Sequence, residues 1–431
     1  MIKSKRIILS VLAVSVLAVW WLGGCGGEER VQEKTGGQAQ NTREPENVSL
    51  DFYTWDDEEN YVGQVVEAYN FLKGRETVRL HIIPKDVYEY WVGNYTPGVK
   101  VDLLGLRGNA NLLALQDKGV LVDLSPYIYK SDLDVAVYGN MYNEIEYEGG
   151  YYGLPARSTS WVLYYNKQLF DAAGVPYPEE MTWAEYLELS EKMFMEDGKN
   201  TIWGGYYLPW RYPISAIQKG YYLLDDDLEP IKESLAFTKK LYDSGNHVPY
   251  EKIKDRDDSN RYDFEKGNIA MLIGEEWLAN MLREDEEAGF SVPDWDIAPL
   301  PVPEGVEKGT TVGMYHFVGM TTACKYPEEA FEFLEFLCGE EGAGIYARNG
   351  MIPAWSNEEI RQIYADSVPG KNTDAFFKTQ KVAEQPMWKG YNQMMDMFKK
   401  DVAFYIEGAC TLDETMEDYK KARDDAFGPG K

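Results

Sequence analysis

The sequence predicts an α/β fold that is divided into two lobes. Short apolar segments with the alternating period of β-strands follow one another along the chain with segments of helical period between them. The predicted folded part has about 385 residues, which is more than one compact core usually accommodates. The sequence contains 12 Trp, 32 Tyr and 16 Phe, so it can bury two cores.

The folded part begins with a predicted strand, helix and strand. Val48, Leu50 and Phe52 alternate with polar residues. The apolar residues of 62–72 recur at intervals of three and four positions, and residues 78–82 again alternate between apolar and polar. Such a unit is expected to pair its two strands in parallel. A third strand at residues 101–104 leads into another helix.

The middle of the chain continues the pattern. Residues 151–167 are rich in aromatic and β-branched side chains and predict strands. A short helix is expected to end at Gly174. Thr182 and Glu185 form a capping box, which predicts the start of a longer helix.

The last hundred residues are predicted to be mainly helical. Pro327 begins a segment with one apolar face, and Gly339 lies just past its end. Further capping boxes are expected at Ser356 to Glu359 and at Thr411 to Glu414.

The amino terminus resembles an export signal. Lys3, Lys5 and Arg6 precede an apolar run at residues 7–22, which is short of the roughly twenty residues that a helix needs to cross a bilayer. The run ends at Leu22-Gly23-Gly24-Cys25, which resembles the bacterial lipobox. This resemblance implies that residues 1–25 are a lipoprotein signal peptide and that Cys25 is lipidated. An uncut membrane anchor and an ordinary secretory signal with an incidental cysteine are the alternatives.

Residues 26–47 are almost entirely polar and are predicted to form a flexible linker, because they cannot bury enough apolar surface to offset the entropy of ordering. The net charge of −29 argues against nucleic acid as a partner. Cys324, Cys338 and Cys410 are an odd number without CxxC spacing, which predicts free thiols, with a single disulfide as the alternative.

Motifs of the common enzyme classes are missing from the sequence. Its three histidines, His81, His247 and His316, do not lie in an HExxH motif, and no GxSxG elbow, P-loop or dinucleotide fingerprint occurs. We therefore expect a protein that is not an enzyme and that holds no metal and no cofactor. A glycoside hydrolase remains a rival interpretation, since the abundant Asp, Glu and Trp would also suit a carboxylate pair. A peptide-binding or adhesion lipoprotein is a second rival.

Three stretches of the sequence carry a family resemblance. They are residues 152–155 with 163–174 and Thr182-Trp183, residues 264–271 with Gly274 and Trp277, and residues 330–334 with 350–354. Their order and spacing resemble the extracellular solute-binding proteins of family 1, the maltose-binding-protein-like group that serves sugar importers of the ABC type. The resemblance covers nearly the whole mature chain.

The resemblance implies a two-lobed periplasmic-binding-protein-like fold of type II, with lobes joined by hinge crossings. One lobe would comprise residues 48–154 plus 310–352, and the other residues 155–309 plus 353–431. The expected function is capture of a carbohydrate outside the cytoplasm by lobe closure and its delivery to the permease subunits of an importer. We expect a lipid-anchored monomer.

A sugar site needs flat aromatic rings for the C–H face of the sugar, and carboxylates, amides or arginines for its hydroxyl rim. In the first lobe, Trp55 with Asp56 and Asp57 follows the first strand, at the carboxyl edge where ligands bind in open α/β sheets. The two aspartates alternatively only stabilise the start of the next helix. Arg107 follows the third strand, and a solvated surface arginine is the alternative there. Tyr315 is a further candidate.

In the second lobe, Trp277 with Glu275 and Glu276 matches the position where members of the family commonly place a stacking aromatic ring. Tyr207 and Trp210 belong to a second aromatic cluster, although aromatic residues more often serve the core. Trp355 and Trp388 follow prolines in late segments that approach the cleft in relatives.

Overall fold

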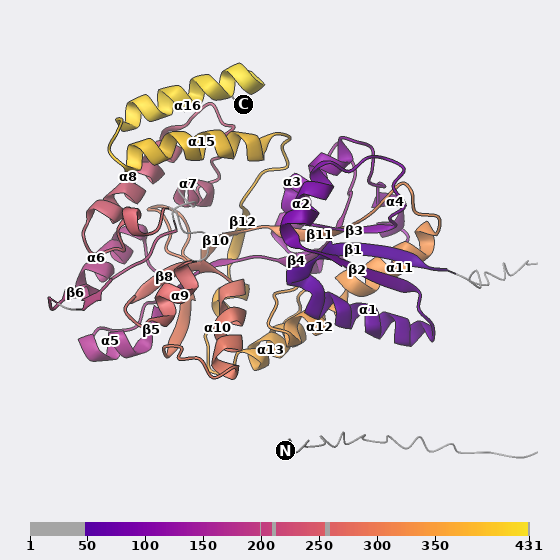
Figure 1. Cartoon of the computed structure of the whole chain (residues 1–431), viewed down its shortest axis with the longest axis horizontal. Coiled ribbons are helices and arrows are strands. Elements are labelled where there is room, and N and C mark those ends of the chain that lie inside the picture. Colours follow the sequence, from indigo (N-terminus) through magenta and orange to yellow (C-terminus); the bar gives the residue numbers. More distant parts are fainter. Residues whose placement is uncertain (1–47, 199, 209–212, 255–258, 430–431) are drawn as a thin grey trace, which may run out of the picture. The chain divides into compact units, whose positions relative to one another are not determined.

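The computed structural model describes residues 48–198, 200–208, 213–254 and 259–429, which are organised around two separate β-sheets (Figure 1). The predictions for residues 1–47, including the signal peptide, Cys25 and the linker, lie outside the described residues, as does Trp210. Of the helices in the described ranges, none combines the length and the apolar character needed to cross a membrane.

The first sheet has five strands in the order β2-β1-β3-β11-β4. β1 pairs in parallel with β2 and with β3, which confirms the predicted parallel pairing. β11 comes from much later in the sequence and pairs antiparallel with β3 and β4, so the sheet is completed by a distant segment. The strands are β1 (Leu50–Trp55), β2 (Val78–Ile83), β3 (Leu103–Leu106), β4 (Leu154–Ser158) and β11 (Tyr315–Met320).

Helices cover both faces of this sheet, as Figure 1 shows. Successive side chains of a strand point to opposite faces, so Leu103 packs into one hydrophobic cluster and Leu104 into the other. The first cluster lies under α1 (Glu59–Lys73), α11 (Pro327–Cys338) and α12 (Glu340–Arg348), and the second under α2 (Lys85–Gly93) and α3 (Gly108–Gln116). Both faces are therefore buried, as in other α/β folds.

The second sheet has three antiparallel strands in the order β8-β5-β9. Every residue of β5 is buried, and the sheet lies within one large core. The strands are β5 (Trp161–Asn166), β8 (Met271–Glu275) and β9 (Trp295–Pro299), and the main helices of this half are α6 (Trp183–Met193), α8 (Glu229–Asp243), α10 (Trp277–Glu287), α13 (Glu358–Ser367), α15 (Tyr391–Ile406) and α16 (Leu412–Phe427).

Shorter elements complete the described residues. They are η1 (Asp56–Glu58), α4 (Ser125–Ile128), η2 (Val135–Tyr138), η3 (Asn140–Glu144), α5 (Lys167–Ala173), β6 (Met195–Glu196), β7 (Thr201–Ile202), α7 (Ile214–Gln218), η4 (Tyr250–Lys252), α9 (Ser259–Glu265), β10 (Thr310–Gly313), α14 (Asp374–Phe377) and β12 (Gln380–Ala383).

The chain passes between the two sheets in several segments. Residues 159–160 join β4 of the first sheet to β5 of the second. After β9 of the second sheet, the chain forms β10, which pairs in parallel with β12. It then continues into β11, which belongs to the first sheet. β4 thus continues in the first sheet up to Ser158, whereas the expected boundary between the lobes lies between residues 154 and 155.

The predicted helix boundaries were mostly confirmed. Thr182 and Thr411 cap α6 and α16 with capping boxes, and α11 begins at Pro327 and ends before Gly339. The box at Ser356 was wrong, because Asn357 is the N-cap of α13 and accepts a hydrogen bond from the Ile360 backbone N–H at 2.9 Å. An asparagine caps a helix at least as well as a serine, which moves the start by one residue. The three described cysteines are free thiols, as expected.

Candidate functional site

A cleft of about 480 Å³ lies between the two halves of the structure. One wall comes from the end of β1, η1 and the starts of α1, α2 and α3, the opposite wall comes from the end of β8 and from α10, and the floor comes from β4 and β11. The lining residues are Trp55, Asp57, Asn60, Tyr61, Lys85, Arg107, Arg157, Thr159, Glu275, Trp277, Asn280, Met281, Glu284, Met314, His316, Asn349 and Met351.

The α10 wall presents an indole beside carboxylates. Trp277 is the first residue of α10, separated by one residue from the strand that ends at Glu275, and its ring is half-buried against the second core. Its Nε1 donates a hydrogen bond to Oε2 of Glu275 at 2.6 Å, which fixes the orientation of the ring. One turn further along, Asn280 donates to Glu284 at 2.9 Å. This wall therefore offers a flat apolar ring bordered by hydrogen-bonding groups.

The opposite wall is built from residues that follow the strands of the first sheet. Trp55 is only 3% exposed and packs against Tyr88 and His316, so little of its ring reaches the cleft. Asp57 and Lys85 form an ion pair at 3.1 Å. Arg107 precedes α3 and forms an ion pair with Glu89 on α2.

The floor of the cleft contains a buried arginine. The side chain of Arg157 on β4 lies between the carboxylates of Glu58 and Glu276, at 3.9 and 3.4 Å. Its Nη1 also donates a hydrogen bond to the Tyr61 hydroxyl at 2.9 Å. Glu58 follows β1 and Glu276 precedes α10, so the two carboxylates come from different halves of the structure. Buried charges of this kind persist when they are paired and hydrogen-bonded.

Burial and pairing shift the pKa values of this cluster in opposite directions. Burial alone would lower the pKa of Arg157, but Tyr61, Glu276 and Glu58 together raise it above its ordinary value. Burial raises the pKa of Glu276, although Arg157 opposes this. Burial, together with the charge of Arg157, lowers the pKa of His316 to about 4. His316 is therefore neutral near pH 7, and Arg157 remains charged.

Five of the residues predicted from the sequence lie together in this cleft: Trp55, Asp57, Arg107, Glu275 and Trp277. Asp56, by contrast, is not part of the lining. Its Oδ1 accepts a hydrogen bond from the backbone N–H of Lys85 at 3.0 Å, so it stabilises the start of α2 rather than the helix that follows it in sequence.

Three other predicted aromatic residues are placed in the cores. Tyr207 is buried in the second core, and its carbonyl accepts a hydrogen bond from Tyr242. Tyr315 is buried in the first half, where its hydroxyl donates to the Tyr138 carbonyl at 2.6 Å. Trp355 is half-buried and packs against cores of both halves. Among the described residues, none of these three belongs to the cleft lining, because their rings pack against the cores.

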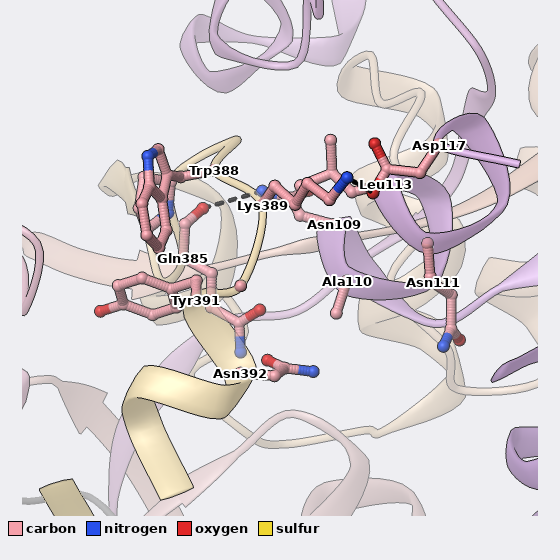
Figure 2. Close-up of a pocket in the computed structure, with 13 residues that line it drawn as sticks. Asn109, Ala110, Asn111, Leu113, Asp117, Gln385, Trp388, Lys389, Tyr391 and Asn392 are labelled. Atoms are coloured by element: carbon pink, nitrogen blue, oxygen red, sulfur yellow. Dashed lines mark hydrogen bonds and ion pairs between the residues drawn. The ribbon is translucent and has the colours of Figure 1, made fainter. Parts of the chain in front are cut away.

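Trp388 lines a second, smaller pocket of about 280 Å³, which Figure 2 shows. This pocket lies between α3 and the segment that precedes α15. Asn109 donates to the Gln385 carbonyl at 2.8 Å, and Lys389 forms an ion pair with Asp117 at 2.8 Å, so two contacts join its sides. The Trp388 ring meets Phe427 edge-on at 5.3 Å.

The residues that the sequence did not single out include Arg157 and its partners Tyr61 and Glu58, whereas Glu276 was noted only beside Trp277. The available signal was a charged residue inside the otherwise small and apolar segment Leu154–Ser158. A charge in a buried strand indicates a partner that is distant in sequence, but it does not identify that partner. In the part of the chain that the structure describes, no group of three His, Cys, Asp or Glu side chains is arranged to hold a metal ion.

Known proteins with a similar sequence or structure share this fold. The model of the family described as bacterial extracellular solute-binding protein matches residues 101–362, more than half of the chain. A sugar transporter from Rhizobium etli, solved in an open conformation, is 26% identical with a TM-score of 0.79, over 87% of this chain and 98% of that one.

Two further relatives are more distant. An ABC substrate-binding protein from Listeria monocytogenes, solved in complex with cycloalternan, is 23% identical with a TM-score of 0.75, over 88% of this chain and 99% of that one. A maltodextrin-binding protein of Bacillus subtilis is 23% identical over 76% of this chain and 78% of its own length. The predicted two-lobed fold of the periplasmic-binding-protein type is thereby confirmed.

Proposed function

Because the chain belongs to the bacterial extracellular solute-binding proteins, we propose that its cleft captures a carbohydrate outside the cytoplasm and presents it to the permease of an ATP-driven importer. The family consists of extracytoplasmic binding proteins that serve ABC transporters rather than of enzymes.

The observation that carries the proposal is the chemistry of the α10 wall. A sugar has a face of C–H groups that packs on a flat ring and a rim of hydroxyls that both donate and accept hydrogen bonds. Trp277 supplies the ring, and Glu275, Asn280 and Glu284 supply the polar groups around it. The relatives that are described as binding cycloalternan and maltodextrin support the same class of ligand.

The cleft is proposed to close by rotation of two lobes about the crossing segments. The lobe partition at residues 48–154 plus 310–352 and 155–309 plus 353–431 is part of this proposal, with its first boundary moved to the end of β4 at Ser158. Since the cleft is lined from both halves, a ligand that contacts both walls binds the closed form more tightly and shifts the population toward it. The permease then binds the closed form, whose surface differs from that of the open, ligand-free form.

Anchoring through a lipidated Cys25 and a monomeric state also belong to the proposal. The lipobox-like Leu22-Gly23-Gly24-Cys25 and the polar residues 26–47 support a tether that keeps the binding domain at the membrane surface. A cleft that is lined by residues of one chain requires no partner copy.

The proposal is tested by a thermal-shift screen of the full-length protein in detergent against neutral mono- and oligosaccharides, with chromatography of the sugar afterwards. A cognate sugar is expected to raise the melting temperature through its selective affinity for the folded state and to be recovered intact. Small-angle scattering with that sugar is expected to show compaction. A screen without any shift, or a cleaved sugar, would contradict the proposed function.

A further inference from the structure

The turn that carries Trp277 is held by a buried tyrosine of the neighbouring strand. Resting on the proposed function, we propose that Tyr164 is a positioning residue for sugar binding, because its hydroxyl fixes residues 275–279 so that the Trp277 ring stands in the cleft. Tyr164 is fully buried on β5 and is not among the described residues that line the cleft, so it acts on the sugar through Trp277.

The hydroxyl of Tyr164 contacts this turn on both sides of the tryptophan. It donates a hydrogen bond to the Glu275 carbonyl at 2.8 Å and accepts one from the backbone N–H of Ala279 at 3.1 Å. A tyrosine hydroxyl can donate and accept at the same time. Burial raises the pKa of Tyr164, so the hydroxyl keeps the proton that it donates. Trp277 lies between the two contacts in sequence, and its backbone is therefore fixed from both directions.

Tyr164 also supplies an acceptor that a capping side chain provides in other helices. An N-cap side chain commonly accepts from the N–H of the third helical residue, which in α10 is Ala279. Glu276 occupies the N-cap position, but its carboxylate accepts from the Ser160 N–H at 3.1 Å and pairs with Arg157 at 3.4 Å. The Ala279 N–H is shared between the Glu276 carbonyl and the Tyr164 hydroxyl, each at 3.1 Å. The start of α10 therefore depends on β5.

Glu275 connects the hydroxyl of Tyr164 to the indole ring. Its carbonyl accepts from Tyr164, and its side-chain Oε2 accepts from Nε1 of Trp277 at 2.6 Å. A shift of the Glu275 backbone would therefore also move the acceptor that orients the ring. Groups that are already held in their binding position lose less entropy when the ligand arrives, so loss of this support should weaken binding.

Gly274 leaves the space through which the Tyr164 ring reaches the turn. A Cβ on Gly274 would lie 3.2 Å from Cε2 of Tyr164 and 3.2 Å from Cδ2 of Leu278, which is closer than ordinary van der Waals contact. β8 thus passes directly over the tyrosine ring, and a larger residue at this position would press on the ring and on the first turn of α10. This contact gives a physical reason for a glycine three positions before Trp277.

The experiment is isothermal titration calorimetry of the full-length protein in detergent with maltotriose, mannotriose and cycloalternan, or, if none of these binds, with the sugar that gives the largest thermal shift. Tyr164→Phe is expected to bind the wild type's tightest sugar about three- to tenfold more weakly, the range that the loss of a hydrogen bond produces. The stoichiometry of the titration reports the folded fraction separately from the affinity.

Tyr419→Phe is the matched control. Tyr419 is also fully buried in the second core, and its hydroxyl donates to the Leu223 carbonyl at 2.9 Å, outside the cleft lining. This variant should lose stability but keep the affinity of the wild type. If Tyr164→Phe likewise lowers the melting temperature without changing the dissociation constant, Tyr164 is a structural residue only and the inference is overturned.

A double-mutant comparison tests whether Tyr164 acts through the tryptophan. In the Trp277→Ala background, adding Tyr164→Phe should leave the dissociation constant nearly unchanged, because no ring remains to be positioned. A loss of affinity that is equal in both backgrounds would overturn the positioning role while leaving carbohydrate capture intact. If the wild type binds no carbohydrate in the titrations or in the thermal-shift screen, the proposed function itself fails and this inference fails with it.

Gly274→Ala decides the question if Tyr164→Phe does not fold. This variant keeps the hydroxyl but presses on its ring, and it is expected to weaken sugar binding roughly threefold or more, because an added methyl in a tight contact displaces its neighbours. Gly93→Ala, which adds a methyl with nothing within 4 Å, should bind as the wild type does. Wild-type affinity in folded Gly274→Ala would then overturn the inference.

Discussion

Nη2 of Arg157 lies 3.4 Å from Oε1 of Glu276, and this ion pair joins a strand of the first sheet to the residue that begins the α10 wall. Ser160 donates its backbone N–H to the other oxygen of Glu276 at 3.1 Å, within the segment where the chain crosses between the sheets. The floor of the cleft is therefore held together by buried charge, and its stability depends on the partners staying matched.

Removing the arginine is predicted to destabilise the fold strongly. Arg157→Met leaves Glu58 and Glu276 buried without their cation, and such a change typically costs about 3 to 5 kcal/mol. Chemical denaturation should show this loss in the free energy of unfolding. Arg157→Lys should be destabilised less because it keeps the charge, and the exposed Arg348→Met should have almost the stability of the wild type.

The pH dependence of the Arg157→Met variant provides a second readout. Burial raises the pKa of Glu276, and a carboxyl with a raised pKa in the folded state favours folding at low pH and loses that contribution as the pH rises. The stability difference between the wild type and the variant should therefore be smaller at pH 5 than at pH 8. A difference that grows on acidification would contradict the buried-carboxylate explanation.

Truncation of the aromatic ring on the α10 wall is predicted to weaken sugar binding. Trp277→Ala removes the proposed stacking surface, and the loss of a central aromatic contact commonly costs about 2 kcal/mol or more. Calorimetry with a cognate sugar should show a dissociation constant at least about tenfold higher. Tyr129→Ala truncates an aromatic side chain that is 86% exposed outside the cleft lining, and it should bind normally. Undiminished binding by Trp277→Ala would exclude the stacking role.

Local periodicity was sufficient to predict the elements but not all of their neighbours. The β1, α1 and β2 unit followed from alternating and helical spacing, because its strand pairing joins segments that are close in sequence. The parallel pairing of Thr310 with Gln380 joins segments seventy positions apart, and neither segment has a pattern that identifies the other. Such pairings depend on the whole topology.

The candidate site shows the same division. Trp277 and Glu275 were identified because they match a position in the second motif of the family resemblance, and the structure places both in the cleft. Tyr315 has an equally suitable side chain, yet its hydroxyl is engaged with the Tyr138 carbonyl inside the core. Residue type alone does not decide between these outcomes, because the direction of a side chain depends on packing against distant segments.

A buried histidine in the second half should make the protein less stable at mildly acidic pH. His247 contacts Asn246 and Tyr186, each at 3.1 Å, and burial lowers its pKa to about 3. The unfolded chain takes up a proton near pH 6.5 that the folded protein does not. The resulting stability is complete above pH 6.5 and is lost as the pH falls, by about 2 kcal/mol between pH 7.5 and 5.

This contribution is isolated by comparing denaturation of the wild type and of His247→Gln across that range. The variant is expected to be less stable at pH 7.5 but to have a flatter pH profile between 6.5 and 5. Parallel profiles for the two proteins would show that His247 does not titrate on unfolding in the way that its burial predicts.

Two glycines are predicted to respond in opposite ways to alanine. A Cβ on Gly204 would lie 1.8 Å from the Ser190 carbonyl oxygen, so Gly204→Ala forces backbone apart and should cost about 3 kcal/mol or more. Gly93 ends α2 with nothing within 4 Å of the added carbon, and Gly93→Ala should be neutral or slightly stabilising. Melting temperatures measured side by side decide the comparison.

The proposed lipid anchor predicts a change of cellular fraction. Cys25→Ala removes the thiol that would carry the lipid but leaves the binding domain unaltered. Because acyl chains contribute about 0.8 kcal/mol per buried methylene, their loss should release the protein from the membrane fraction. Immunoblots of membrane and soluble fractions from cells expressing either form measure this, and binding of a cognate sugar by the released variant controls for folding. A variant that remains in the membrane fraction would favour the alternative of an uncut apolar anchor at residues 7–22.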